Sequence, residues 1–216
     1  MSAQIQRSDD PPKLPGFKAW FGRTWMAFFG WRVDAARPEG ITKAVVVAAP
    51  HTSNWDLTFT LGVSYVLGIK ISWIGKHTLF KPPLGWLLKF LGGVPVNRSG
   101  RHNAVAAAVE LLQKSGPLML VVPPEGTRSK ATRWKTGFYY IAVGAKVPII
   151  LGYVDYARKL AGIGKVFYPS GDIEKDFGLI REFYADMKGK FPDRAGEITV
   201  APPEKDAAVA SLSSPD

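Results

Sequence analysis

The sequence has no cysteine and only three histidines among its 216 residues. Without cysteine, the chain has no disulfide, no thiolate nucleophile and no metal site built on thiolates. This composition is compatible with the cytosol. Any nucleophilic chemistry must therefore use another group of the protein, or a group of the substrate itself.

Long uninterrupted apolar runs are also absent. No segment reaches the roughly 18 to 20 apolar residues that a membrane-spanning helix needs. Residues 1–15 contain Asp9, Asp10 and several prolines around no apolar centre, which is not typical of a secretory signal. We expect a mobile polar arm at residues 1–15 and a flexible tail at residues 202–216.

Acidic residues are few relative to basic ones. The chain has 28 Lys and Arg against 18 Asp and Glu, a formal net charge of +10. This surplus favours an acidic partner, which is nucleic acid, an anionic membrane surface or a phosphorylated substrate. Composition alone does not separate the three.

Residues 16–31 combine aromatic side chains with helical spacing. Phe17, Trp20, Phe21, Thr24 and Phe28 share one helical face, and basic residues lie nearby. One interpretation is a helix packed on the core. The other is an amphipathic helix at a membrane interface, where Trp and Phe with basic neighbours are favoured.

Beyond this segment, strand-like and helical patterns alternate. The expected strands cover 44–48, 71–74, 94–96, 118–122, 147–153 and 165–168. The expected helices cover 55–67, 84–91, 103–114, 137–145 and 173–188. Such alternation predicts a single layered α/β domain at residues 32–201, with a largely parallel sheet flanked by helices, plus the N-terminal amphipathic aromatic helix.

His51 and Asp56 follow the apolar run at 44–48. Residues five apart lie about 140° from each other on an ideal helix, so the two side chains meet only if His51 precedes the helix. Ser53 is a good N-cap, which makes an acidic cap one interpretation of Asp56, and a core histidine is the corresponding interpretation of His51. The functional interpretation is a pair in which Asp56 orients His51 as a general base.

Two further clusters come after predicted strands. Arg98 follows the strand at 94–96, and a Gly-Thr-Arg sequence with Glu125 follows the strand at 118–122. Ligands of α/β sheets bind beyond the carboxyl ends of the strands, so these groups and His51 are expected to converge. Arginines hold phosphate in bidentate fashion, and Lys76 and Lys135 add positive charge. For each basic residue alone, a solvated surface charge is the alternative.

Three blocks together resemble the glycerolipid acyltransferase family, which includes the 1-acylglycerol-3-phosphate (lysophosphatidate) acyltransferases. These blocks are His-x4-Asp at 51–56, GGVPVNR at 92–98 and PEGTRS at 124–129. The resemblance implies an acyltransferase domain at 32–201, with His51 as the base and Asp56 as its partner. It also implies substrate binding by Arg98, Glu125, Gly126, Thr127 and Arg128. We add Lys76 to this set, because it too follows a predicted strand.

The resemblance implies that a fatty acyl group moves from acyl-CoA or acyl carrier protein to a hydroxyl of lysophosphatidate or a related lysolipid. We expect no cofactor and no metal, because a thioester carbonyl is already electrophilic. We also expect peripheral attachment at the cytoplasmic face of the membrane, with residues 1–31 as polar arm and membrane-interface helix.

Three other functions remain open. A non-catalytic lipid-binding protein on the same scaffold would not need His51 and Asp56. A hydrolase would use water in place of the lipid alcohol. A nucleic-acid-binding protein is suggested by charge alone; because no recognisable module for that task is found, we expect no nucleic-acid partner.

Overall fold

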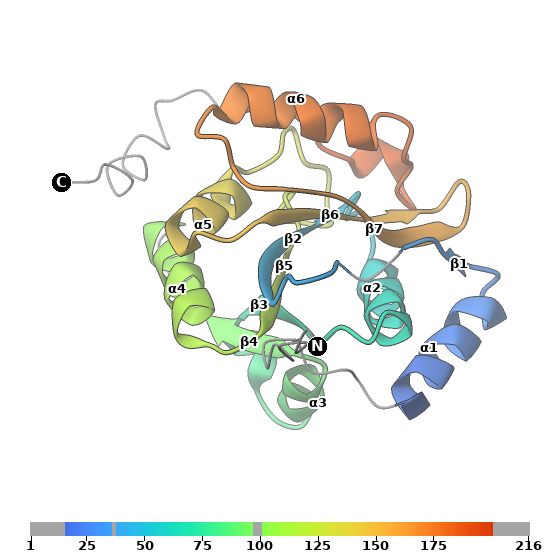
Figure 1. Ribbon diagram of the computed structural model, residues 1–216. Coiled ribbons are helices and arrows are strands. Elements are labelled where there is room, and N and C mark those ends of the chain that lie inside the picture. The colour runs from blue at the N-terminus through green and yellow to red at the C-terminus, as the bar shows by residue number, and fades with distance from the viewer. Residues whose placement is uncertain (1–15, 36–37, 97–100, 201–216) are drawn as a thin grey trace, which may run out of the picture.

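The computed structural model describes residues 16–35, 38–96 and 101–200. A seven-stranded sheet in the order β1-β7-β6-β2-β5-β3-β4 forms its centre (Figure 1). The strands are β1 (Arg32–Val33), β2 (Lys43–Ala49), β3 (Ile71–Lys76), β4 (Gly93–Val96), β5 (Leu118–Val122), β6 (Ile149–Asp155) and β7 (Leu160–Phe167). The expected arm at 1–15 and tail at 202–216 lie outside the described residues.

Five neighbouring strands of this sheet, β6 to β4, run parallel, whereas β7 pairs with β6 antiparallel. The register pairs Val47 of β2 with Val122 of β5 and Leu151 of β6. The carboxyl ends of β2, β5 and β6 therefore lie at one edge of the sheet. The expectation of a largely parallel α/β sheet is confirmed.

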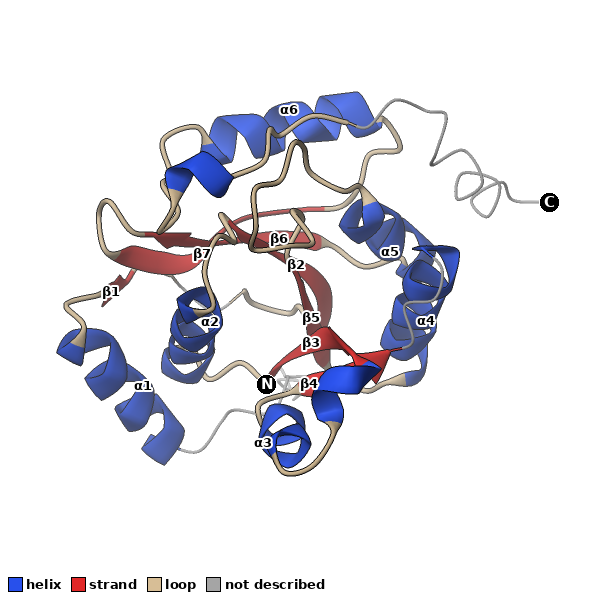
Figure 2. Cartoon of the chain, turned by 180° about the vertical axis from the view of Figure 1, so that it is seen from behind, coloured by secondary structure: helices blue, strands red, loops and turns tan. Residues whose placement is uncertain are grey.

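Helices cover both faces of the sheet (Figures 1 and 2). They are α1 (Gly16–Phe28), α2 (Trp55–Val66), α3 (Leu84–Phe90), α4 (Arg101–Lys114), α5 (Gly137–Ala145) and α6 (Ile173–Tyr184), with short 3-10 turns η1 (His77–Phe80) and η2 (Pro192–Arg194). Helices α4, α5 and α6 cover one face. Helix α2 covers the other, and α1 lies outside α2.

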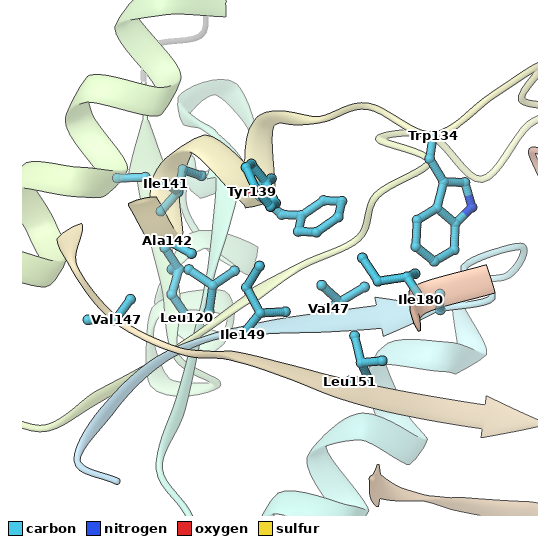
Figure 3. Packing of buried hydrophobic residues seen from close by; sticks show 14 of the residues in the cluster. Val47, Leu120, Trp134, Tyr139, Ile141, Ala142, Val147, Ile149, Leu151 and Ile180 are labelled. Atoms are coloured by element: carbon cyan, nitrogen blue, oxygen red, sulfur yellow. The ribbon is translucent and has the colours of Figure 1, made fainter. Parts of the chain in front are cut away.

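The central strands are buried on both faces, which is why they are continuous apolar runs rather than alternating patterns. Successive side chains of a strand point to opposite faces. Val45 and Val47 join the cluster beneath α4, α5 and α6, where Ile149 and Phe138 are also buried (Figure 3). Val46 joins the cluster on the α2 face.

Helix α1 has one packed face and one exposed face. Gly22 and Met26 are buried where α1 crosses α2. A Cβ at Gly22 would lie 2.9 Å from the carbonyl oxygen of Gly62, and one at Gly62 would lie 2.7 Å from the sulfur of Met26, so the crossing needs glycine on both helices. Phe17 and Trp20 remain largely exposed. The packed face fits the interpretation of a helix on the core, and the membrane-interface interpretation stays a prediction.

Some boundaries differ from the predicted ones. Helix α6 ends at Tyr184, before the expected end at 188. The chain leaves the helix because the backbone N–H of Lys188 donates to the buried carboxylate of Asp155. Strand β1 was not predicted, since two residues carry no periodic signal. Within the described ranges, no helix combines the length and apolarity needed to cross a bilayer.

Candidate active site

His51 lies on a turn between the end of β2 and the start of α2, as the spacing predicts. Helix α2 begins at Trp55, and Asn54 occupies the N-cap position. The expectation that Ser53 is the N-cap is wrong by one residue. The Ser53 hydroxyl instead accepts the N–H of Trp55, which tightens the turn before the helix starts.

The Asp56 carboxylate holds this turn together. The backbone N–H groups of Thr52 and Ser53 both donate to Oδ2, over N–O distances of 2.9 and 2.8 Å. The same oxygen lies 3.2 Å from Nδ1 of His51. The two interpretations of Asp56, as a cap and as a partner of His51, are therefore compatible in geometry. Because Nδ1 faces the carboxylate, Nε2 is the nitrogen available for proton transfer, and the His51 side chain is 19% exposed.

Tyr156 holds the second oxygen of Asp56. Its hydroxyl donates to Oδ1 over 2.7 Å, and its ring packs edge-on against Trp31 and Phe59. Burial, followed by the bond to Asp56, raises the pKa of Tyr156 far above its usual value, so the hydroxyl remains a donor. Sequence reasoning missed this residue. Its position one residue past the carboxyl end of β6, at the same edge as His51, is the signal that would have identified it.

Glu125 holds the backbone of the His51 turn through a hydrogen bond. Its side chain is 2% exposed, and Oε1 accepts the backbone N–H of His51 over 3.0 Å. Among the residues that the structure describes, Oε2 of Glu125 has no hydrogen-bond partner. Burial raises the pKa of Glu125, and the bond from the His51 N–H opposes this shift. Glu125 thus faces the protein interior, whereas the residues that follow it face solvent.

The loop after Glu125 folds back on itself. Gly126 has a φ of +66°, which favours glycine, and a Cβ there would lie 2.7 Å from the Nζ atom of Lys135. The Thr127 hydroxyl accepts the N–H of Ser129, and Arg128 is exposed. The loop that follows Glu125, which contacts the His51 turn, therefore presents its backbone, the Thr127 hydroxyl and the cationic side chains of Arg128 and Lys135.

The remaining predicted residues lie on the next strands of the sheet. Lys76 is exposed at the end of β3, which pairs there with β4. It therefore shares the edge of the sheet with His51. Arg98 lies outside the described residues. In the described part of the chain, no three His, Asp or Glu side chains are grouped so that they could hold a metal ion.

The segment after α6 covers the His51 turn. The N–H of Phe191 donates to the Thr52 hydroxyl over 3.2 Å, and the ammonium of Lys190 lies 5.3 Å from the Trp55 ring centroid. The N–H of Tyr156 donates to the carbonyl of Lys188. Residues 188–191 therefore fix both the turn and the tyrosine.

An apolar cavity of about 40 Å³ lies between α2 and the sheet. Most of its lining is aliphatic, from β2, β5, β6 and α2, and includes Val46, Ala48, Val63, Met119 and Val121. Ala48 precedes His51 by three residues, so the cavity reaches the strand that leads to the site. The lining is apolar, but a cavity of this volume has room for only about one or two methylene groups.

The chain is similar to known acyltransferases. A family model described as Acyltransferase matches residues 32–151. The chain is 30% identical over 163 residues to 1-acyl-sn-glycerol-3-phosphate acyltransferase beta of Homo sapiens, over 71% of this chain and 57% of that protein. It is 27% identical to the 1-acyl-sn-glycerol-3-phosphate acyltransferase of Haemophilus influenzae, over 67% of this chain and 62% of that protein.

Similarity extends to a solved structure. The crystal structure of the 1-acyl-sn-glycerophosphate (LPA) acyltransferase, PlsC, from Thermotoga maritima aligns with a TM-score of 0.53. The alignment covers 79% of this chain and 75% of that chain at 22% identity, which supports a shared fold. The chain spans about three fifths of the length of the curated relatives named above.

Proposed function

We propose, from the premise that this chain belongs to the Acyltransferase family, that it transfers a fatty acyl group to a hydroxyl of lysophosphatidate or a related lysolipid. The observation that carries the proposal is the contact between His51 and Asp56. One carboxylate oxygen is held by two backbone N–H groups and lies 3.2 Å from the imidazole. Such a fixed carboxylate is what a histidine needs to act as an oriented general base.

In this proposal Nε2 of His51 removes the proton from the acceptor hydroxyl. The resulting oxygen attacks the carbonyl carbon of a thioester, acyl-CoA or acyl carrier protein, and forms the new ester bond. The carbon–sulfur bond breaks, and the leaving thiolate receives the proton from His51. A thiol has a reference pKa of about 8.5, so its thiolate is a good leaving group. No covalent enzyme intermediate is needed.

Asp56 and Tyr156 act on this reaction through His51. The carboxylate stabilises the positive charge that the imidazole carries after it takes the proton. The Tyr156 hydroxyl prevents rotation of the carboxylate by binding its other oxygen. Glu125 fixes the backbone of the same turn. We therefore regard Asp56, Tyr156 and Glu125 as positioning residues.

The phosphate end of the acceptor is proposed to bind at the loop after Glu125. Gly126 and Thr127 allow the backbone to approach the phosphate, and Arg128 with Arg98 supplies charge-assisted hydrogen bonds. Lys76 shares that edge of the sheet, and Lys135 lies against Gly126. The cationic residues of this edge favour an acceptor with a negative headgroup.

The acyl chain is proposed to enter the cavity under α2, which has to widen to take more than about one or two methylene groups. Its lining is aliphatic, and it begins beside the strand that carries the His51 turn. The length of chain that fits would then depend on the side chains lining the cavity.

A lysolipid acceptor stays in the bilayer, so we propose that the protein is peripheral at the cytoplasmic face of the membrane. The exposed aromatic face of α1 can bury apolar area in the headgroup region. Basic residues near an anionic surface each add on the order of 1 kcal/mol of attraction.

The test uses the purified full chain with acyl-CoA or acyl carrier protein and a panel of detergent-dispersed lysolipids. We expect an acylated lysolipid, identified by mass, and a rate that falls about 10²–10⁴-fold in His51→Ala. Lipid binding without any acyl transfer would mean a lipid-binding protein instead. Release of free fatty acid without acylated lipid would mean a hydrolase.

A further inference from the structure

Helix α3 is apolar, yet most of its side chains lie outside the core. Its sequence is LGWLLKF, and only Gly85 is buried. Trp86 is 71% exposed and Phe90 is 74% exposed, with Leu84 and Leu87 about half exposed. Exposed apolar patches of this kind mark interaction surfaces.

The packing of α3 explains why these side chains cannot turn inward. A Cβ on Gly85 would lie 2.0 Å from the carbonyl oxygen of Phe80, so the helix contacts η1 through a glycine. The Phe80 ring fills the space below, where Cβ atoms on Gly75 and Gly93 would lie 2.7 Å from it. This packing fixes the orientation of α3, so its apolar side chains stay exposed.

The exposed faces of α3 and α1 are neighbours. The Lys18 ammonium of α1 lies 5.6 Å from the Phe90 ring centroid and 5.7 Å from that of Tyr65. Both helices lie at the lower side of the molecule in both views (Figures 1 and 2). We define the α1–α3 surface by its exposed apolar residues: Phe17, Trp20, Phe21, Leu84, Trp86, Leu87 and Phe90.

The chain around this surface has no acidic residue. From Leu57 to Val109 the sequence contains no Asp or Glu, and the same holds for residues 11–33. Lys81 and Lys89 are exposed at either end of α3. A second copy of this chain would bring the same positive charges against this surface. An anionic lipid layer offers apolar depth and negative headgroups together, which matches both features.

We infer that α3 is a second lipid-contacting element, which together with the amino-terminal half of α1 attaches the protein to an anionic membrane. The inference deepens the proposed function, on which it rests for the lysolipid acceptor. The chain enters η1 and α3 directly from the end of β3, at the edge where the His51 turn lies. Helix α3 then runs back along the sheet, because the carbonyl of Gly92 after it accepts the N–H of Trp73 in β3, so its Phe90 end lies away from the His51 turn.

The test compares the full chain with its Trp86→Ser/Phe90→Ser variant. Tyr168→Ser is the matched control, because Tyr168 is 67% exposed and follows β7, which is separated from β3 and β4 in the sheet by β6, β2 and β5. Co-sedimentation uses vesicles of phosphatidylcholine with phosphatidylglycerol. We expect the double variant to bind about tenfold or more weakly, the control to bind normally, and added salt to weaken all three.

Activity on a detergent-dispersed short-chain lysolipid separates this inference from the proposed function. The double variant is expected to keep that activity and to lose activity on lysolipid in vesicles. Vesicle binding equal to that of the full chain would overturn the inference, even if acyl transfer is confirmed. Absence of acyl transfer in every protein would overturn the proposed function, while the sedimentation result would still decide about α3. If the full chain is a dimer and the double variant is a monomer, a second copy of the chain occupies this surface, and the inference is overturned.

Discussion

Replacing Asp56 with Asn separates the two interactions that this carboxylate combines. The asparagine oxygen can take the place of Oδ2 and accept the N–H groups of Thr52 and Ser53. Its NH2 group then takes the place of Oδ1, opposite the Tyr156 hydroxyl. The turn keeps its hydrogen bonds, but His51 loses the negative charge beside Nδ1.

The two effects differ in size. A hydrogen bond to a charged group contributes about 1.5–3 kcal/mol, and one between neutral groups about 0.5–1.5 kcal/mol. Two such bonds weaken here, so the free energy of unfolding should fall by about 2–3 kcal/mol. Domains have about 5–15 kcal/mol of stability, so the variant stays folded. An unoriented base without its counter-charge loses about 10³–10⁴-fold in rate.

The assay follows thiol release from acyl-CoA, beside a thermal melt of the same sample. Tyr156→Phe is the graded comparison, because it removes one donor to Asp56 and keeps the charge. Its rate should fall by about tenfold to a hundredfold, less than that of Asp56→Asn. A folded Asp56→Asn protein with a rate within tenfold of normal would refute the orienting function and leave only the cap.

The other predictions concern charge, phosphate and chain length. Burial raises the pKa of Glu125, so the native chain should lose stability as pH rises from below the ordinary glutamate value through the raised one. The melting temperature of Glu125→Gln relative to the native chain should therefore rise with pH. For Glu110→Gln this difference should fall with pH, because Lys114 lowers the pKa of Glu110. A Glu125→Gln difference that is independent of pH would contradict the prediction. Arg128→Ala should raise the acceptor KM about tenfold to a hundredfold and leave the donor KM unchanged, and an equal rise in both would indicate a structural effect. Ala48→Leu should fill part of the cavity and favour shorter acyl chains, so an unchanged chain-length profile would exclude the cavity as the acyl site.

Local patterns predicted the fold well where burial was continuous. The apolar runs of β2 and β5 were identified because both of their faces are covered. The starts of α2 and α3 were predicted from turn residues and prolines just before them. The end of α6 was not, because it depends on Asp155, which is 33 positions away from the N–H that it captures.

The candidate site was predictable only in part, for the same reason. The contact of His51 with Asp56 follows from spacing within one turn. Tyr156 reaches Asp56 from 100 residues along the chain, and no local pattern records such a pairing. The inward direction of Glu125 likewise depends on where two strands lie in the sheet. Spacing identifies neighbours in sequence, whereas these contacts follow from strand order.

The cover formed by residues 188–191 links the site to the order in which the chain is made. All of the proposed positioning residues are synthesised before this segment, and only then can Thr52 accept the N–H of Phe191 and Tyr156 donate its N–H to Lys188. A nascent chain that stops after α6 therefore contains His51 and Asp56 but lacks the contacts that hold their turn against Tyr156. On the ribosome, the site can therefore be completed only after residues 188–191 have emerged. A chain released early would carry the motif residues without their finished geometry.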